Sequence, residues 1–400
     1  MSSIFGYQLL NEFAFNFGKN LAGVLVAPIL TVFYIIYCSL FDAESSVLRL
    51  RKVLLLFIVQ IVPFIPLFGQ EYQPTAESDY LRYVFYARKM LEHETLWGSD
   101  QLFFSDAGKH LVTQPGYRYF LLVELLLFGK FIRAIQFLEI LLYLISVYFF
   151  TLAIHKSIKK GPTKKIILLV ILLITPAAIK NLLLGLSEWL VLIFMMWACY
   201  FHLVTRNHII SIFILGLIPF IRQNLLFGTV LVYAPLLNQS TKKWLTLIAF
   251  IVPLGLPLYH NLYYAGEWRY FVDVARIPFL TYNENEVAVN GINYSLIASN
   301  LLHYIGFDII NDQVTFSIIG FIFLPLSVYL FFLLVKAIRV PKLKILFILS
   351  TLSTSIPTLL LGSAYYPRFE LVNVMFMLTT FLLISNSAFG RNSERSTQEA

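Results

Sequence analysis

Long apolar runs separated by short polar segments dominate the pattern of this chain. Most of the runs approach about 17–25 residues, the length that an α-helix needs to cross a hydrocarbon core of about 30 Å. Their apolar residues are continuous instead of alternating, and a backbone in lipid must satisfy its own hydrogen bonds, so helices are predicted and strands are not. The chain is therefore predicted to be an all-α polytopic membrane protein.

Basic residues collect in the short segments between runs, and this placement sets the predicted orientation, because cytoplasmic loops carry an excess of Lys and Arg. With these segments inside, the chain follows a path of about 11 spans and its N-terminus lies outside. The predicted spans are 21–41, 53–69, 134–154, 165–182, 184–204, the short pair 209–221 and 225–237, then 244–260, 316–336, 345–361 and 371–385.

Two long polar segments, 70–133 and 261–315, fall on the predicted outer side. The first contains a short apolar stretch, 117–129. If this stretch crossed the membrane, the lysine-rich segment after Ile154 would lie outside, so a helix lying in the outer interface is predicted. Residues 1–390 are expected to form one membrane domain, and 391–400 a disordered cytoplasmic tail.

Composition excludes a soluble enzyme, because 58% of the residues are hydrophobic and 13% are charged, whereas soluble domains carry roughly 25% charge. The net charge of +8 does not indicate a nucleic-acid partner, since the basic residues lie in the orienting loops. The first twenty residues carry Glu12 and lack a basic start followed by an apolar core, so no cleavable signal peptide is predicted.

Two carboxylates, Glu77 and Asp79, lie at the predicted membrane surface in the first outer segment. Asp79 shares the spacing i, i+3, i+4 and i+7 with Arg82, Tyr83 and Tyr86, so these residues share one face if the segment is helical. One interpretation is a capped amphipathic helix on the membrane surface. The other is a carboxylate at the boundary of water and lipid, where desolvation makes it a general base.

Two further charged residues interrupt apolar segments near predicted outer ends. Glu188 opens a span behind Ser187, where it either caps the helix or belongs to a functional site. Arg222 lies between the two short helices, a position that suits anion binding better than snorkelling towards the interface.

Arg368 lies between aromatic residues at the mouth of the last predicted pair of spans, where a planar guanidinium suits a phosphate oxygen. The alternative is an interfacial anchor paired with Glu370. His260, Trp268 and Arg269 begin the second outer segment among tyrosines, as in an aromatic belt or a sugar-binding surface. The carboxylates and histidines of the first outer segment admit a divalent cation, but no spacing there indicates a metal site.

Four short motifs occur in the order in which glycosyltransferases of the GT-C type carry them, and the chain resembles that superfamily of polytopic enzymes over about 300 residues. The matching elements are Glu77-Ser78-Asp79-Tyr80, Gln114-Pro115-Gly116-Tyr117 with 121–129, Ser187-Glu188, and Tyr366-Pro367-Arg368-Phe369. The acidic pair is often adjacent in the family, whereas Ser78 intervenes here, which leaves Asp79 and Glu77 as alternative bases. Gln114 replaces a common His, and the span 21–41 is extra to the common core.

The resemblance implies transfer of a sugar from a polyprenyl-phosphate donor to a glycan, lipid or protein acceptor, at the outer face of a plasma or inner membrane. Asp79 or Glu77 would be catalytic. The other residues would bind substrate: Arg82, Tyr83, Glu188, Arg222, His260, Arg269 and Arg368. A weaker resemblance to exopolysaccharide polymerases keeps polymerisation open. A flippase or transporter is the non-enzymatic alternative, although charge gathered on one side counts against it.

Overall fold

The computed structural model describes residues 79–92, 116–129, 131–158, 162–183, 185–265, 268, 270, 307–310, 313–316, 318–361 and 371–385. Helices account for most of these residues, which confirms the predicted helical class. The elements in chain order are α4 (Asp79–Glu92), α6 (Gly116–Phe128), α7 (Ile132–Ser157), α8 (Pro162–Leu183), α9 (Glu188–Leu203), α10 (His208–Ile221), η4 (Gln223–Leu225), α11 (Leu226–Gln239), α12 (Lys243–Ala265), β1 (Phe307–Ile310), β2 (Gln313–Phe316), α15 (Ile318–Ala337), α16 (Pro341–Leu361) and a final helix, Leu371–Ser385.

Three helices in the described ranges are long and apolar enough to cross a membrane: Arg133–Ser157, Thr163–Leu183 and Lys243–Leu262. Five shorter apolar helices accompany them: Glu188–Leu203, His208–Ile221, Gln223–Leu237, Pro325–Ala337 and Leu371–Ser385. These helices are compatible with a membrane protein. The count of about 11 spans stays a prediction, and the predicted spans 21–41 and 53–69 lie outside the described residues, as does the tail 391–400.

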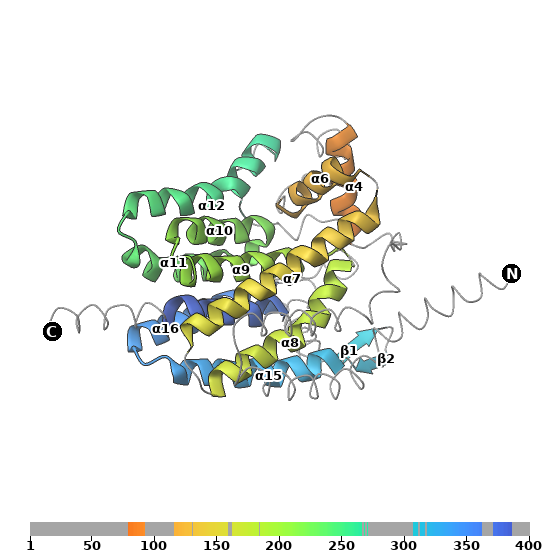
Figure 1. Cartoon of the computed structure of the whole chain (residues 1–400). Helices are drawn as coiled ribbons and strands as arrows, with labels where there is room; N and C mark the ends of the chain where they lie inside the picture. Colours follow the sequence, from red (N-terminus) through yellow and green to blue (C-terminus); the bar gives the residue numbers. More distant parts are fainter. Residues whose placement is uncertain are drawn as a thin grey trace, which may run out of the picture.

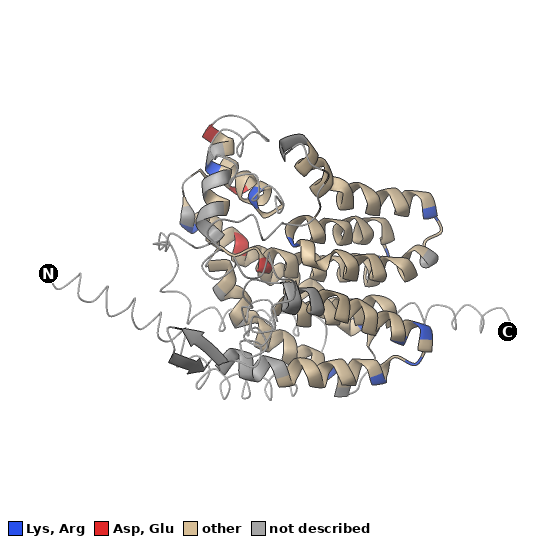
Figure 2. Ribbon diagram, turned by 180° about the vertical axis from the view of Figure 1, so that it is seen from behind, with Lys and Arg blue, Asp and Glu red and all other residues tan. Residues whose placement is uncertain are grey.

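The helix assembly has two chemically different ends (Figures 1 and 2). One, here called the basic end, carries exposed cations in the connections between helices and in the adjoining helix ends: Lys156, Arg206, Lys242, Lys243, Lys336, Arg339 and Lys342. The other, called the acidic end, holds α4 and α6 (Figure 2). Glu124 lies on α6, Glu139 is near Glu124, and Glu188 precedes Trp189, which contacts Tyr117 of α6. The basic segments that set the predicted orientation therefore gather at one end in the described part of the chain.

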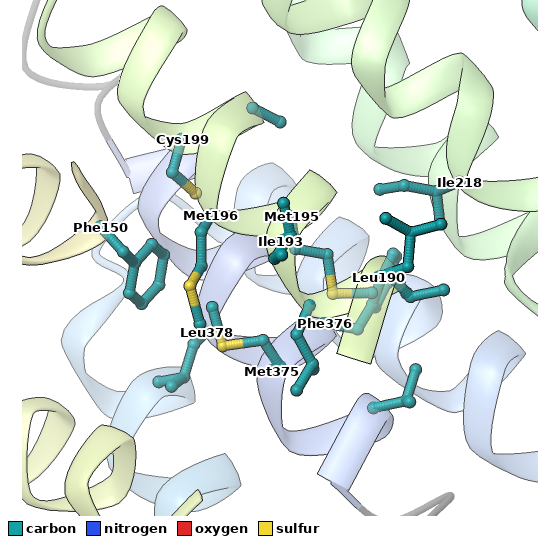
Figure 3. Close-up of a cluster of buried hydrophobic side chains, with 14 of the residues drawn as sticks. Phe150, Leu190, Ile193, Met195, Met196, Cys199, Ile218, Met375, Phe376 and Leu378 are labelled. Carbon is teal, nitrogen blue, oxygen red and sulfur yellow. The ribbon is translucent and has the colours of Figure 1, made fainter. Parts of the chain in front are cut away.

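The core lies around α9, which packs between α7 and α10 and against the Leu371–Ser385 helix. Phe376 of that final helix also lies beside Gly228 of α11. Both α9 and the final helix bury almost every side chain, because apolar residues occupy their whole circumference, as expected for helices enclosed by others. Figure 3 shows Met196 and Cys199 of α9 beside Met375 and Leu378 of the final helix. The Cys199 thiol is buried, with Sγ 4.0 Å from the carbonyl oxygen of Thr379.

The pair α10 and α12 forms one of the most extensive helix contacts in the described structure. A Cβ added at Gly216 would stand 2.8 Å from the carbonyl oxygen of Phe250, so glycine permits this close approach. Two prolines, Pro253 and Pro257, lie inside α12, and the helix bends between its two halves (Figure 1). Proline provides no N–H for the helix ladder, which explains the bend.

A short antiparallel hairpin of β1 and β2 precedes α15, with Phe307 opposite Phe316 and Ile310 opposite Gln313. It lies at the end of the predicted outer segment 261–315. No strands were predicted there from the sequence. Elsewhere the predicted boundaries agree closely with the structure. The short pair α10 and α11, separated at Arg222, is confirmed, and the predicted span 184–204 corresponds to a helix that begins at Glu188.

Candidate functional site

The first turn of α6 is the centre of the candidate site, because each of its first five residues contacts another element. Gly116 lies against the end of α10, where an added Cβ would be 2.7 Å from the carbonyl oxygen of Phe220. The Tyr119 ring stacks on the Phe220 ring, with centroids 5.9 Å apart. A larger residue than glycine at 116 would separate α6 from α10, so this position requires a residue without a side chain.

Aromatic rings connect α6 to α4 and α9. Tyr83 of α4 meets Tyr117 edge to face, with ring centroids 5.2 Å apart. Tyr117 and Phe120 both approach Trp189 of α9, at 6.5 and 5.4 Å between centroids. The indole Nε1–H of Trp189 donates to the Tyr117 hydroxyl over 3.4 Å. Edge-to-face pairs of this kind stabilise beyond the area they bury, so these rings fix α6 against α4 and α9.

Glu188 and Arg222 form an ion pair beside this aromatic cluster. Glu188 is the first residue of α9 and is 1% exposed, while Arg222 is the residue that ends α10. Ser187 makes no side-chain hydrogen bond to the start of α9. A carboxylate at a helix N-terminus is stabilised by the helix dipole, and here Arg222 also neutralises it. The pair thus joins the beginning of α9 to the end of α10.

His260 of α12 connects to the same turn of α6. Its Nε2 lies 3.4 Å from Nη2 of Arg118, and its Nδ1 lies 3.0 Å from the Tyr119 hydroxyl. Arg118 is 2% exposed and His260 is 5% exposed, while Tyr119 is half-buried. The Tyr119 and His260 rings also meet edge to face at 5.8 Å. Residues about 140 positions apart in the chain therefore form one buried polar cluster.

A pair of buried carboxyl groups lies in the same part of the molecule, Glu124 on α6 and Glu139 on α7. They are near enough for their negative charges to act on one another. In the described structure neither oxygen of Glu124 has a hydrogen-bond partner. Burial raises the pKa of the Glu124 carboxyl to about 9, so this group holds its proton at neutral pH.

Two of the sequence-selected residues, Tyr83 and His260, contact the first turn of α6. Glu188 and Arg222 pair with each other next to Trp189 and Ile221, which contact that turn. Asp79 is the first residue of α4 and Arg82 lies in its first turn, so the predicted helix is present. Glu77, Arg269 and Arg368 lie outside the described residues. The described part of the chain holds no group of three or more His, Cys, Asp or Glu side chains able to bind a metal ion.

Sequence reasoning missed the buried polar residues of α6 and α7 as site candidates, namely Arg118, Tyr119, Glu124 and Glu139. A signal was present for the two glutamates, since each is a single charge inside an apolar run, and such a charge indicates a functional or paired group. Comparison with protein-family models, curated proteins and solved structures finds no match for this chain.

Proposed function

We propose that this chain is a membrane glycosyltransferase that moves a sugar from a polyprenyl-phosphate-linked donor to an acceptor at the outer face of the membrane. One arrangement supports the proposal above all: of the residues selected separately from the sequence, Tyr83 and His260 contact the first turn of α6, and Glu188 and Arg222 pair beside it. This turn packs against α4, the helix that begins at Asp79. The resemblance to GT-C enzymes supplies the donor class, and the residues supply the roles.

In the proposed reaction, the acceptor hydroxyl oxygen attacks the anomeric carbon, and Asp79 or Glu77 takes up the hydroxyl proton. The bond between the anomeric carbon and the phosphate oxygen breaks, and polyprenyl phosphate leaves with the electron pair. A general base must be ionised before it accepts a proton. The positive end of α4 favours the ionised carboxylate at Asp79.

The remaining residues have binding roles in this scheme. Arg368 supplies positive charge for the departing phosphate, which a fixed cation in a poorly hydrated site stabilises most effectively. Arg222, selected from the sequence for the same role, is paired with Glu188 and orients that carboxylate. Glu188, held by Arg222, and His260 position sugar hydroxyls. Arg82, Tyr83 and Arg269 complete the substrate-binding surface.

The test replaces the two candidate bases singly, as Asp79→Asn and Glu77→Gln, and measures transfer of labelled sugar from a panel of polyprenyl-phosphate-linked sugars in membranes. Loss of a general base lowers the rate by about 10²–10⁴-fold, so one of the two variants is expected to lose transfer while its expression stays normal. Glu92→Gln is the matched control, because Glu92 lies exposed at the other end of α4. Full activity in both variants would exclude the catalytic assignment.

The length of the product separates this function from polymerisation. A single sugar transfer adds one increment on a gel, whereas a polymerase that joins lipid-linked repeats gives a ladder. Movement of a labelled lipid-linked sugar across vesicles without a new glycosidic bond would instead indicate a flippase and refute the enzymatic proposal.

A further inference from the structure

We infer that the surface around the start of α12 docks an anionic phospholipid from the membrane leaflet at the basic end. The lysines of this surface bind the lipid phosphate, and its apolar stripe lies against the acyl chains. The inference concerns the end of the molecule opposite the candidate site, so it does not depend on the proposed sugar transfer. The residues of this surface, here called the α12 surface, are Lys242, Lys243, Trp244, Ile248, Ile251 and Val252.

The backbone of Lys242 is held on both sides by hydroxyl groups. Its N–H donates to Oγ of Ser240 over 3.2 Å, and its carbonyl oxygen accepts from Oγ1 of Thr246 over 3.0 Å. Ser240 and Thr246 are buried, and their hydroxyl oxygens lie 2.6 Å apart. These hydrogen bonds fix the turn from which α12 begins, while the side chains of Lys242 and Lys243 stay exposed.

The connections at the basic end carry charge of one sign. The segments 156–165, 203–210, 237–245 and 335–345 contain lysines and arginines but no Asp or Glu. The ammonium groups of Lys242 and Lys243 therefore find no carboxylate within these connections. An anionic partner complements such a surface, and each Lys or Arg near an anionic lipid surface contributes about fivefold in affinity.

An exposed apolar stripe continues from the lysines along α12. Trp244 is 77% exposed, and Ile248, Ile251 and Val252 are each more than half exposed. These positions follow the spacing i, i+4, i+7 and i+8, so they lie on one face of the helix. A Cβ added at Gly255, which continues this spacing, would meet nothing within 4 Å. Figure 1 shows α12 at an edge of the helix assembly, so the stripe faces away from the other helices.

The combination of cations, an indole and an apolar stripe favours a phospholipid over other anions. Trp is enriched where headgroups meet hydrocarbon, because its indole joins an apolar ring to an N–H donor. Exposed apolar patches of this kind mark contacts with membranes or proteins. A phospholipid has acyl chains for the stripe and a phosphate for the lysines in one molecule, whereas a soluble anion would leave the stripe unused.

The two lysines are expected to select the net charge of the headgroup. Phosphatidylglycerol is negatively charged, whereas the trimethylammonium group of phosphatidylcholine cancels the charge of its phosphate. Two lysines that each contribute about fivefold predict a preference for phosphatidylglycerol of about tenfold or more. Lipids with the same acyl chains therefore isolate the role of the lysines from that of the stripe.

The test measures binding of dioleoyl phosphatidylglycerol and dioleoyl phosphatidylcholine to the purified full chain in detergent by native mass spectrometry. The natural protein is expected to prefer phosphatidylglycerol by the factor given above. The double variant Lys242→Gln with Lys243→Gln is expected to bind the two lipids equally. No preference in the natural protein, or an unchanged preference in this variant, would overturn the inference.

A matched control separates the position of the charges from their number. Arg206→Gln with Lys336→Gln also removes two exposed cations of the basic end, but on other connections. Because salt screens exposed charges that do not contact the phosphate, this control is expected to keep the preference within about threefold of the natural protein. An equal loss of preference in the two double variants would show a general effect of charge and refute the α12 surface.

Trp244 tests the apolar part of the surface. Trp244→Ala removes the indole at the head of the stripe, so it is expected to weaken binding of both lipids by about three- to tenfold. Trp268→Ala is the matched control, because Trp268 is also exposed but lies beyond the other end of α12. Normal affinity in Trp244→Ala, or an equal loss in Trp268→Ala, would overturn the assignment of the acyl chains to this stripe.

The same spectra distinguish other occupants of the α12 surface. Inorganic phosphate that binds as tightly as phosphatidylglycerol would refute the lipid ligand. A dimer of the natural protein that Trp244→Ala converts to a monomer would place a second copy of the chain on this face and refute the lipid as its occupant. Binding of phosphatidylglycerol that requires both lysines and Trp244 supports the α12 surface, even if sugar transfer is refuted.

Discussion

The two ends of the helix assembly place their charges in opposite ways. At the basic end the lysines and arginines of the connections and the adjoining helix ends are exposed, as Lys156, Arg206, Lys242 and Lys336 illustrate. At the acidic end several charged groups lie inside, with Arg118, Glu124 and Glu188 at 2% exposure or less, although Arg88 and Glu92 of α4 are exposed there. Exposed charges cost little and contribute little to stability, whereas buried charges require partners.

The predicted orientation in the membrane depends on the basic end, whereas the candidate site lies at the acidic end. The cations of the basic end can be exchanged for one another, since their effect on orientation depends on number and not on geometry. The residues of the acidic end depend on particular partners, as Glu188 does on Arg222. Functional sites are commonly built from such buried, partnered groups, so the comparison directs experiments to the acidic end.

The largest expected effect comes from breaking the ion pair. Arg222→Ala leaves the Glu188 carboxylate buried without its cation, and removal of one partner of a buried pair costs about 3–5 kcal/mol. At the basic end Lys242→Ala should change stability by less than about 0.5 kcal/mol, because its side chain is exposed. Thermal unfolding in detergent, followed by tryptophan fluorescence, measures both.

A double-mutant cycle sharpens this result. Adding Glu188→Gln to Arg222→Ala should recover part of the lost stability, because the unpaired charge is then removed. Equal melting temperatures for Arg222→Ala and Lys242→Ala would contradict the proposed contrast between the two ends.

The second effect depends on pH and involves Glu124. Its pKa is raised by burial to about 9, so the folded chain holds this proton at pH values where the unfolded chain has released it. Stability therefore falls as the pH rises from about 4.5 towards 9, by at most about 1.4 kcal/mol per pH unit. Glu124→Gln does not titrate, so its stability relative to the natural protein should increase steadily between pH 6 and pH 8.

Melting curves at several pH values test this expectation. Glu92→Gln serves as the control, since Glu92 is exposed on α4 and its replacement should leave the pH dependence unchanged. A constant difference between Glu124→Gln and the natural protein across this range would show that Glu124 is ionised in the folded chain.

The smallest expected effect is on stability and concerns the residues that precede α10 and α9. At the basic end the Asn207 side chain accepts a hydrogen bond from the backbone N–H of Ile210, at 3.2 Å, and thereby caps α10. Asn207→Ala should cost about 1 kcal/mol. Ser187, at the start of α9, makes no capping hydrogen bond, so Ser187→Ala loses no cap and should cost less than Asn207→Ala. A greater loss for Ser187→Ala in thermal unfolding would reverse this comparison.

Sequence features within each segment predicted most of the helices that the structure describes. The polar triplet Arg222-Gln223-Asn224 interrupts an apolar run, and the structure separates α10 from α11 there. Glu188 marks the start of α9 because acidic residues favour helix N-termini. The hairpin was missed, although β-branched residues flank the two-residue segment Asn311-Asp312, which is a recognisable hairpin pattern.

The candidate site was harder to predict, because its contacts cross long stretches of sequence. Glu188 and Arg222 were selected individually as isolated charges, but nothing in the sequence indicated that they pair. Arg118 belongs to the helix that was predicted to lie in the outer interface, and its side chain is buried against His260, 142 positions away. Periodicity describes one helix at a time, so it gives no information about such partners.

The two prolines of α12 affect the geometry of the polar cluster formed by Arg118, Tyr119 and His260. They divide the helix into an N-terminal part that packs on α10 and a C-terminal part that carries His260. Without the N–H groups of Pro253 and Pro257, the carbonyls of Ala249 and Pro253 have no i+4 donor in the helix ladder. The junction is held by fewer hydrogen bonds than an uninterrupted helix, and the bend of α12 lies there. The bend directs the C-terminal part of α12, and with it His260, towards Arg118 of α6.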